Sequence, residues 1–290
     1  MSTVVPRAER VPPIGTTVAA RTRDSWSRWS LVVASILALA GFSWPLVATA
    51  LPQDAQAAVP GLALALVPAV VIALALTLDR QVHTASTVAL LGVLAAVGAA
   101  IRIAGTGVGG LEAVFIVLIL AGRAYGARFG FLLGMLTILL SSVFWGGIGP
   151  WTPFQVFACG WVAAGAGLLP RITVGSPRTR ARLEIALLVG YGILASYVFG
   201  LIMNFWFWPF GVGAGTDISY LAGAPIERNL ASFGLYSLVT STLTWDTVRA
   251  ITTTVGIVLI GPAALAALRR AKIGRAAQRP SPHLPGQTEK

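Results

Sequence analysis

Cysteine and histidine are nearly absent from this chain of 290 residues, and their scarcity excludes several kinds of chemistry. A lone cysteine, Cys159, supports neither a disulfide framework nor a cysteine metal cluster. The two histidines, His83 and His283, fall in segments that we assign to the cytoplasmic side, so we expect no histidine site for a metal or a general base. The Gly-x-x-x-x-Gly-Lys-Ser/Thr phosphate loop is also missing. We therefore predict a protein that is not an enzyme, with no catalytic residue, metal site or cofactor.

Charged residues are few as well: they make up 11% of the chain, against 56% hydrophobic residues, and the mean hydropathy is +0.80. So little polar surface cannot cover the exterior of a soluble domain. The net charge of +11 would suggest nucleic acid as the partner of a soluble protein. Basic residues also collect at the cytoplasmic ends of membrane helices, however. The composition therefore predicts an all-α polytopic membrane protein that contacts membrane lipid and no nucleic acid.

Eight apolar runs are candidates for membrane helices, which need roughly 20 residues to cross the bilayer. We place them at 30–51, 60–78, 85–103, 111–122, 128–146, 152–170, 183–206 and 246–268. The stretch 230–243 is either an interfacial helix or the lead-in to the last span. Charged residues lie near the ends of these runs, which disfavours a self-sufficient proton pump or antiporter. These residues are Arg102, Glu112, Glu184, Asp246 and Arg249.

The arginine distribution orients the predicted spans. With a cytoplasmic N-terminus, the inner segments hold 18 basic residues and the outer segments hold three. This bias indicates an even number of spans with both termini in the cytoplasm of a bacterial cell. The outer segments 104–110, 146–153 and 207–230 are rich in glycine, proline and aromatic residues. We therefore expect the function to lie on the outer face, where the loops are long and varied.

Small residues recur at helical spacing along one face of the third span, and small side chains let another helix approach closely in lipid. This face either packs inside the bundle or contacts a partner subunit; its members are Ala85, Ala89, Gly92, Ala96 and Ala100. A second set spans a predicted loop, which favours tight turning and internal packing. It comprises Gly122, Gly126, Gly130 and Gly134.

Six of the nine tryptophans fall at predicted outer ends, beside polar residues in three successive connections. A symmetric interfacial belt would not cluster in this way, so the pattern predicts a ligand site. Asp246 has two other interpretations: an acid in the first helical turn complements the helix dipole, or it pairs with Arg249 three residues on. The candidate ligand-binding residues are Arg102, Glu112, Trp145, Trp151, Phe154, Gln155, Asn204, Trp206, Trp208, Trp245, Asp246 and Arg249.

Two stretches carry a resemblance to a known family: Gly110-Leu-Glu-Ala-Val-Phe through Leu120 to Gly134, and Phe144-Trp-Gly-Gly-Ile-Gly-Pro-Trp-Thr-Pro-Phe-Gln155. Over about residues 85–270 the chain resembles the S components of energy-coupling factor (ECF) transporters, and most of all their cobalamin-type group. The resemblance implies a six-helix core at 84–270 after a two-helix extension at 30–80. Residues 1–29 and 271–290 would be cytoplasmic tails.

The resemblance also implies partners. An S component captures a vitamin outside the cell and docks on a transmembrane T component that carries two ATPase subunits. The family docks through an Ala-x-x-x-Ala motif on the first core helix, which here reads Ala89-Leu-Leu-Gly-Val93, with Val93 in place of the second alanine. The small-residue face of the third span would then be the partner interface.

Three hypotheses follow. The first is an ATP-driven importer subunit that holds a cobalamin-like vitamin by aromatic faces and hydrogen bonds to its amide rim. The second is the same role for a thiamine- or queuosine-type compound, because aromatic rings with Asp246 or Glu112 would suit a cationic heterocycle. The third is a subunit that scaffolds a membrane enzyme and transports nothing.

Overall fold

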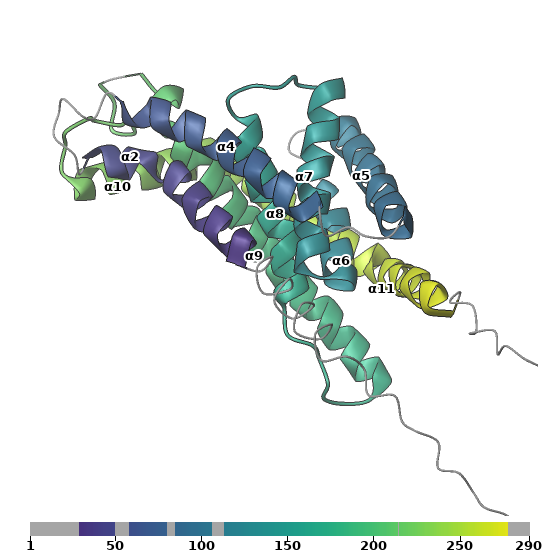
Figure 1. Ribbon diagram of the computed structural model, residues 1–290. Coiled ribbons are helices and arrows are strands. Elements are labelled where there is room, and N and C mark those ends of the chain that lie inside the picture. The colour runs from purple at the N-terminus through teal and green to yellow at the C-terminus, as the bar shows by residue number, and fades with distance from the viewer. Residues whose placement is uncertain (1–28, 50–57, 80–84, 106–112, 214, 278–290) are drawn as a thin grey trace, which may run out of the picture.

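The computed structural model describes residues 29–49, 58–79, 85–105, 113–213 and 215–277, and every regular element in these ranges is a helix. Figure 1 shows their arrangement. The elements are the helix Trp29–Phe42, α2 (Trp44–Thr49), α4 (Val59–Asp79), α5 (Ala85–Gly105), α6 (Val114–Tyr125), α7 (Ala127–Phe144), α8 (Thr152–Leu168), α9 (Pro177–Gly211), α10 (Ile226–Ser237), the π-helix η1 (Leu238–Asp246) and α11 (Thr247–Ala277).

Four helical stretches of the described chain are long and apolar enough to cross a membrane: 85–105, 127–144, 177–211 and 226–271. The all-helical class is therefore confirmed, and the composition of these helices is that of a membrane-embedded protein. The number of spans and the division into a core and an N-terminal extension stay predictions.

The centre of the bundle is the tightly packed pair α7 and α8. A Cβ atom added at Gly130 or Gly134 of α7 would meet backbone atoms of α8, and one added at Gly122 of α6 would meet the carbonyl group of Ala163 on the same helix. Only glycine allows the main chains of α6 and α7 to approach α8 so closely. Gly126 joins α6 to α7 at a φ of +95°, a conformation that other residues rarely adopt. The predicted role of these glycines in turning and internal packing is confirmed.

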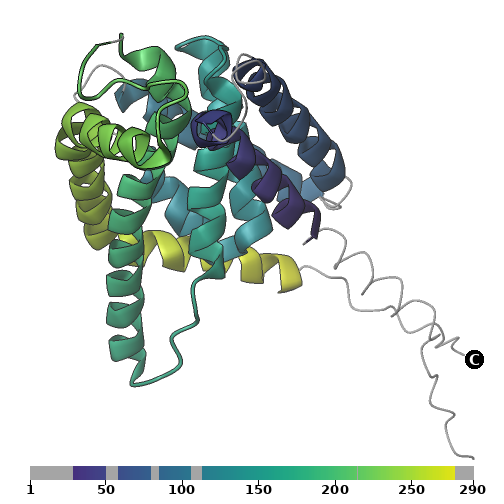
Figure 2. The same cartoon turned by 90° about the vertical axis from the view of Figure 1, so that its left-hand side faces the viewer.

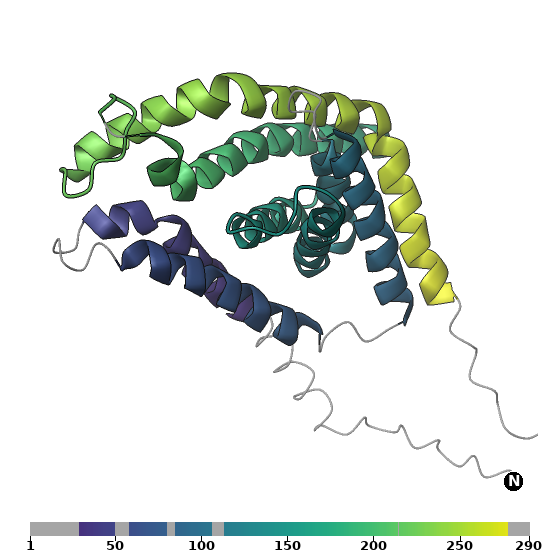
Figure 3. The ribbon, with the colours of Figure 1, turned by 90° about the horizontal axis from the view of Figure 1, so that it is seen from above.

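The N-terminal helices cover one side of the bundle. In Figure 3 the helix Trp29–Phe42 and α4 lie together on the side opposite the long helix formed by α10, η1 and α11. They are joined to α8 by a hydrogen bond from Nε1 of Trp161 to Oγ of Ser35, at 2.9 Å. Phe42 is buried against Phe154 of α8, with ring centroids 4.9 Å apart. These helices are thus part of the same core.

Residues 226–277 form one continuous helix. Residues 230–243 lead into the last predicted span, because α10 is followed without a break by η1 and then by α11. Their position at the membrane interface stays a prediction. Asp246 therefore does not begin a helix, and the prediction that it lies in a first helical turn is wrong. Figures 2 and 3 show a bend within α11, which contains Pro262, so that its last turns run crosswise to α9. Proline lacks the amide N–H that would continue the helical hydrogen bonding, which explains the bend.

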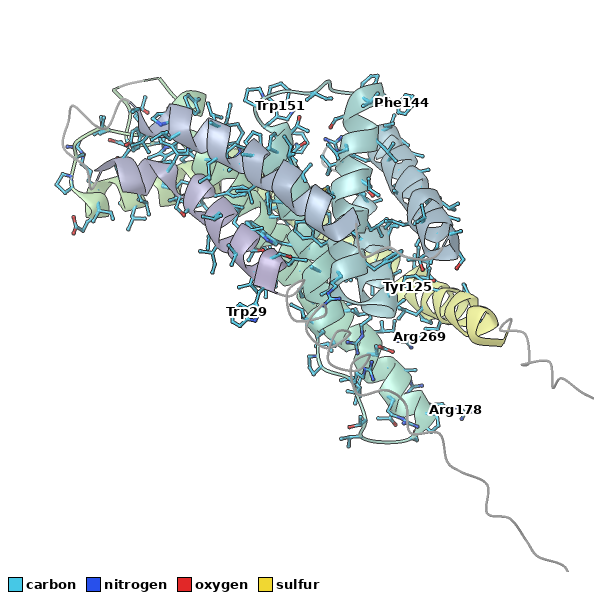
Figure 4. All side chains as sticks on the ribbon, in the orientation of Figure 1. Trp29, Tyr125, Phe144, Trp151, Arg178 and Arg269 are labelled. Atoms are coloured by element: carbon cyan, nitrogen blue, oxygen red, sulfur yellow. The ribbon has the colours of Figure 1, made fainter. Side chains whose placement is uncertain are left out.

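The bundle has two chemically different ends. Figure 4 shows Phe144 and Trp151 at one end, which we call the aromatic end, whereas Arg178 and Arg269 lie toward the opposite, basic end. The aromatic end holds the connection between α7 and α8, and the basic end holds the connection between α8 and α9. The separation of aromatic residues from arginines agrees with the charge pattern of the sequence. A binding site can therefore lie at the aromatic end, at the basic end or in the core between them.

Candidate functional site

The small-residue face of α5 points away from the bundle. All five of its members are exposed: Ala85, Ala89, Gly92, Ala96 and Ala100. A Cβ atom added at Gly92 would meet no described atom within 4 Å. Other residues of the helix, among them Leu91, Ala95 and Gly98, are buried. Within the part of the chain that the structure describes, this face is therefore not packed inside the bundle.

Near the aromatic end, α5 contributes Arg102 to a polar cluster. Its Nη1 donates to Oγ of Ser141 on α7 at 2.8 Å, and its Nη2 donates to Oε1 of Gln155 on α8 at 3.2 Å. Arg102 and Gln155 are both partly exposed. Two of the candidate ligand-binding residues are thus brought together, although they are 53 positions apart in the sequence.

Beside this cluster, Phe154 and Trp206 are stacked face to face, with ring centroids 4.3 Å apart and an interplanar angle of 6°. Both rings are buried. The Nε1 of Trp206 has no acceptor among the described residues, which is unusual because a buried indole N–H normally has a partner. Phe42 and Phe154 make an edge-to-face contact. Nothing in the sequence indicated this contact, because Phe42 lies inside a predicted span and not in an outer connection.

The remaining tryptophans are separated. Trp208 is fully buried in a second small core with Phe233 and Tyr236, and its Nε1 donates to the carbonyl oxygen of Ile218 at 2.6 Å. The other three candidate ligand-binding tryptophans are exposed: Trp145 at 55%, Trp151 at 41% and Trp245 at 50%. Trp206 and Trp208 therefore lie in different packing clusters. Glu112 lies outside the described residues.

Inside the bundle, Asp246 and Arg249 form an ion pair, with Nη1 of Arg249 2.6 Å from Oδ1 of Asp246. Both are buried, at 1% and 5% exposure. The pairing interpretation at three-residue spacing is confirmed. The helix continues on both sides of them, and their place near the end of a membrane span stays a prediction.

Polar groups of η1 and α9 extend this pair into a network. Oγ of Ser241 donates to Oδ2 of Asp246 at 2.9 Å, and Asn204 donates from Nδ2 to Oγ of Ser241 at 2.6 Å. Arg249 also donates to the carbonyl oxygen of Ser196 at 3.2 Å. Asn204, Asp246 and Arg249, all candidates from the sequence, are thus joined through Ser241.

Two local features make room for the network. A Cβ atom at Gly200 of α9 would collide with the carboxylate of Asp246, so a glycine is required where α9 passes the pair. The π-helix η1 ends at Asp246, and π-helical turns inserted in longer helices are frequent at functional sites. The guanidinium of Arg249 lies over the ring of Phe199, 4.8 Å from its centroid, where the ring's negative face attracts it.

These groups offer a ligand neutral and charge-assisted hydrogen bonds beside aromatic surface. Among the described residues no group of three or more potential metal-binding side chains is found. Comparison of the chain with protein-family descriptions, with curated proteins and with solved structures finds no match.

Proposed function

We propose that this protein is the substrate-binding membrane subunit of an ATP-driven vitamin importer of the ECF type. It captures a small molecule at the aromatic end, which faces out of the cell, and docks on a T component that carries two ATPase subunits. The proposal rests on the resemblance of residues 85–270 to S components. The observation that carries it is the uncovered small-residue face of α5, which suits close contact with a helix of a partner.

The ion pair of Asp246 and Arg249 helps to distinguish a neutral ligand from a cationic one. The charge of Asp246 is balanced by Arg249, so this carboxylate has no free charge to offer to a cationic heterocycle. Among the described residues, the aromatic end then offers aromatic surface, the Arg102–Gln155 pair and the Nε1 of Trp206, which has no described acceptor. Such groups favour a large ligand with many neutral hydrogen-bonding groups, and therefore a cobalamin-like corrinoid over a thiamine- or queuosine-type compound. Native mass spectrometry of the purified protein would identify a retained vitamin by its mass.

Tryptophan substitution of the α5 face tests the docking role. Ala89→Trp and Gly92→Trp place a bulky side chain where a partner helix must approach closely. When the transporter subunits are produced together in cells, uptake of labelled cobalamin should fall at least about tenfold. Binding of cobalamin to the isolated subunit should be unchanged, because neither side chain packs inside the bundle.

The matched control is Leu259→Trp, an exposed position on α11, which should leave uptake intact. Unchanged uptake in both α5 variants would contradict docking through this face and would favour the scaffold hypothesis.

A further inference from the structure

A cavity of about 560 Å³ lies at the basic end, between α6, the connection from α8 to α9, and α11. Four charged residues are in its lining: Arg123, Arg171, Glu184 and Arg269. Arg123 donates from Nε to Glu184 at 2.9 Å, and its two Nη atoms donate to backbone carbonyl oxygens of the α8–α9 connection. Arg123 thus neutralises Glu184, and the cavity keeps the positive charge of Arg171 and Arg269. Arg269 also donates to Glu184, yet its side chain remains 46% exposed.

A second cavity, of about 460 Å³, adjoins the first and shares Glu184 and Arg269 with it. It lies between α9 and the bent part of α11 and is mainly apolar, with Ile185, Pro262, Leu265 and Ala266 in its lining. Figure 2 shows that the last turns of α11 run crosswise to α9. A positively charged cavity and an apolar groove therefore meet at one end of the membrane-embedded helices.

We propose that the two adjoining cavities bind one anionic phospholipid, with its phosphate at Arg171 and Arg269 and an acyl chain in the apolar groove. Basic pockets between membrane helices on the cytoplasmic side suit the headgroups of anionic lipids. A soluble phosphate would use only the first cavity, whereas an amphiphile fills both.

The chain's own tails do not complement this charge. Residues 1–28 hold five basic and two acidic residues, and residues 278–290 hold two basic residues and one acidic residue. Both segments are net positive, like the cavity.

Lipid titration of the full-length protein in detergent, followed by native mass spectrometry, tests the proposal. Phosphatidylglycerol should bind at least about tenfold more tightly than phosphatidylcholine with the same acyl chains. The double substitution Arg171→Gln and Arg269→Gln should weaken phosphatidylglycerol binding about thirtyfold, which corresponds to about 2 kcal/mol. The matched control is Arg178→Gln with Arg180→Gln. These two arginines are exposed near the same connection but are absent from the lining of both cavities, and their loss should change the affinity less than about threefold.

A second variant separates a lipid from a free anion. Ala266 is exposed and lines only the apolar groove, so Ala266→Trp should weaken phosphatidylglycerol binding while leaving both arginines in place. Inorganic phosphate, titrated as a competitor, should not displace the lipid. Two results would overturn the proposal: an equal loss in the Arg178/Arg180 control, or displacement by phosphate together with no effect of Ala266→Trp. The first would mean surface charge without a site, and the second a site for free anions.

Discussion

Asp246 and Arg249 are costly residues to bury, because removing two charges from water is repaid only when their remaining groups are hydrogen-bonded. Here Ser241 donates to the carboxylate, and the guanidinium donates to a backbone carbonyl oxygen and lies over the ring of Phe199. Both charged groups of the pair therefore have hydrogen-bond partners besides each other. Well-packed apolar residues would often serve stability equally well, and ionisable residues inside membrane segments usually mark a function.

The first prediction separates stability from function at this pair. Asp246→Ala leaves the Arg249 guanidinium buried without a counter-ion and should destabilise the protein by about 3–5 kcal/mol, seen as a lower unfolding temperature in detergent. The double substitution Asp246→Leu with Arg249→Met should recover most of that loss, because it removes both charges. If the network contributes to ligand binding, the double variant will fold and yet bind cobalamin more weakly. A double variant less stable than Asp246→Ala would contradict this account.

The second prediction uses the two buried tryptophans of α9. Trp206→Phe keeps a ring against Phe154 and removes an indole N–H that has no described acceptor. Trp208→Phe removes an N–H that donates to Ile218. Both substitutions remove a similar side-chain volume. The difference between their free energies of unfolding therefore measures the hydrogen bond from Trp208 to Ile218. Trp208→Phe should therefore be less stable than Trp206→Phe by about 1 kcal/mol.

The effects on ligand affinity should be in the opposite order to the effects on stability. If the free N–H of Trp206 serves the ligand, Trp206→Phe will weaken cobalamin binding in calorimetry while Trp208→Phe will not. Equal affinities in both variants would remove Trp206 from the site.

At the scale of helices, the sequence predicted helix ends where glycine or proline interrupts an apolar run. Gly126 and Pro150 mark real ends, because a left-handed turn and the connection before α8 need such residues. The continuity of α10, η1 and α11 was only one of two alternatives for residues 230–243. Charged residues in membrane helices usually lie at the ends, so Asp246 and Arg249 suggested the start of a span. Ser196 lies 53 positions from Arg249, and Asn204 lies 37 positions from Ser241, so only the fold brings the network together.

The third prediction concerns the packing of α7 on α8. Gly134→Ala places a Cβ atom against the backbone of Cys159 and should destabilise the protein by about 1–3 kcal/mol through overpacking. Gly190→Ala is the matched control, because this exposed helical glycine has no described atom near its added Cβ. It should be neutral or slightly stabilising, since alanine favours a helix. Thermal unfolding of both variants measures the difference, and equal unfolding temperatures would contradict the close approach of α7 and α8.

At the scale of the whole molecule, the N-terminal helices join the candidate site to the rest of the chain. Nε1 of Trp44 donates to the carbonyl oxygen of Trp206, and the hydroxyl of Tyr220 donates to the carbonyl oxygen of Pro45. Burial raises the pKa of the Tyr220 hydroxyl above its ordinary value, which favours the protonated form that donates this hydrogen bond. No local pattern could have predicted these contacts, because up to 175 positions separate the partners.

The final prediction tests which end of the bundle faces out of the cell. Of the two ends, the basic one should face the cytoplasm, because lysine and arginine are retained there during insertion. Single cysteines at Ile148, in the aromatic-end connection, and at Val174, in the basic-end connection, occupy exposed positions. In a Cys159→Ala background, an impermeant thiol reagent should label position 148 in intact cells. Position 174 should react only after the membrane is permeabilised. Labelling of position 174 but not 148 in intact cells would reverse the orientation. The Trp206 region would then face the cytoplasm, where it could not capture a vitamin from outside.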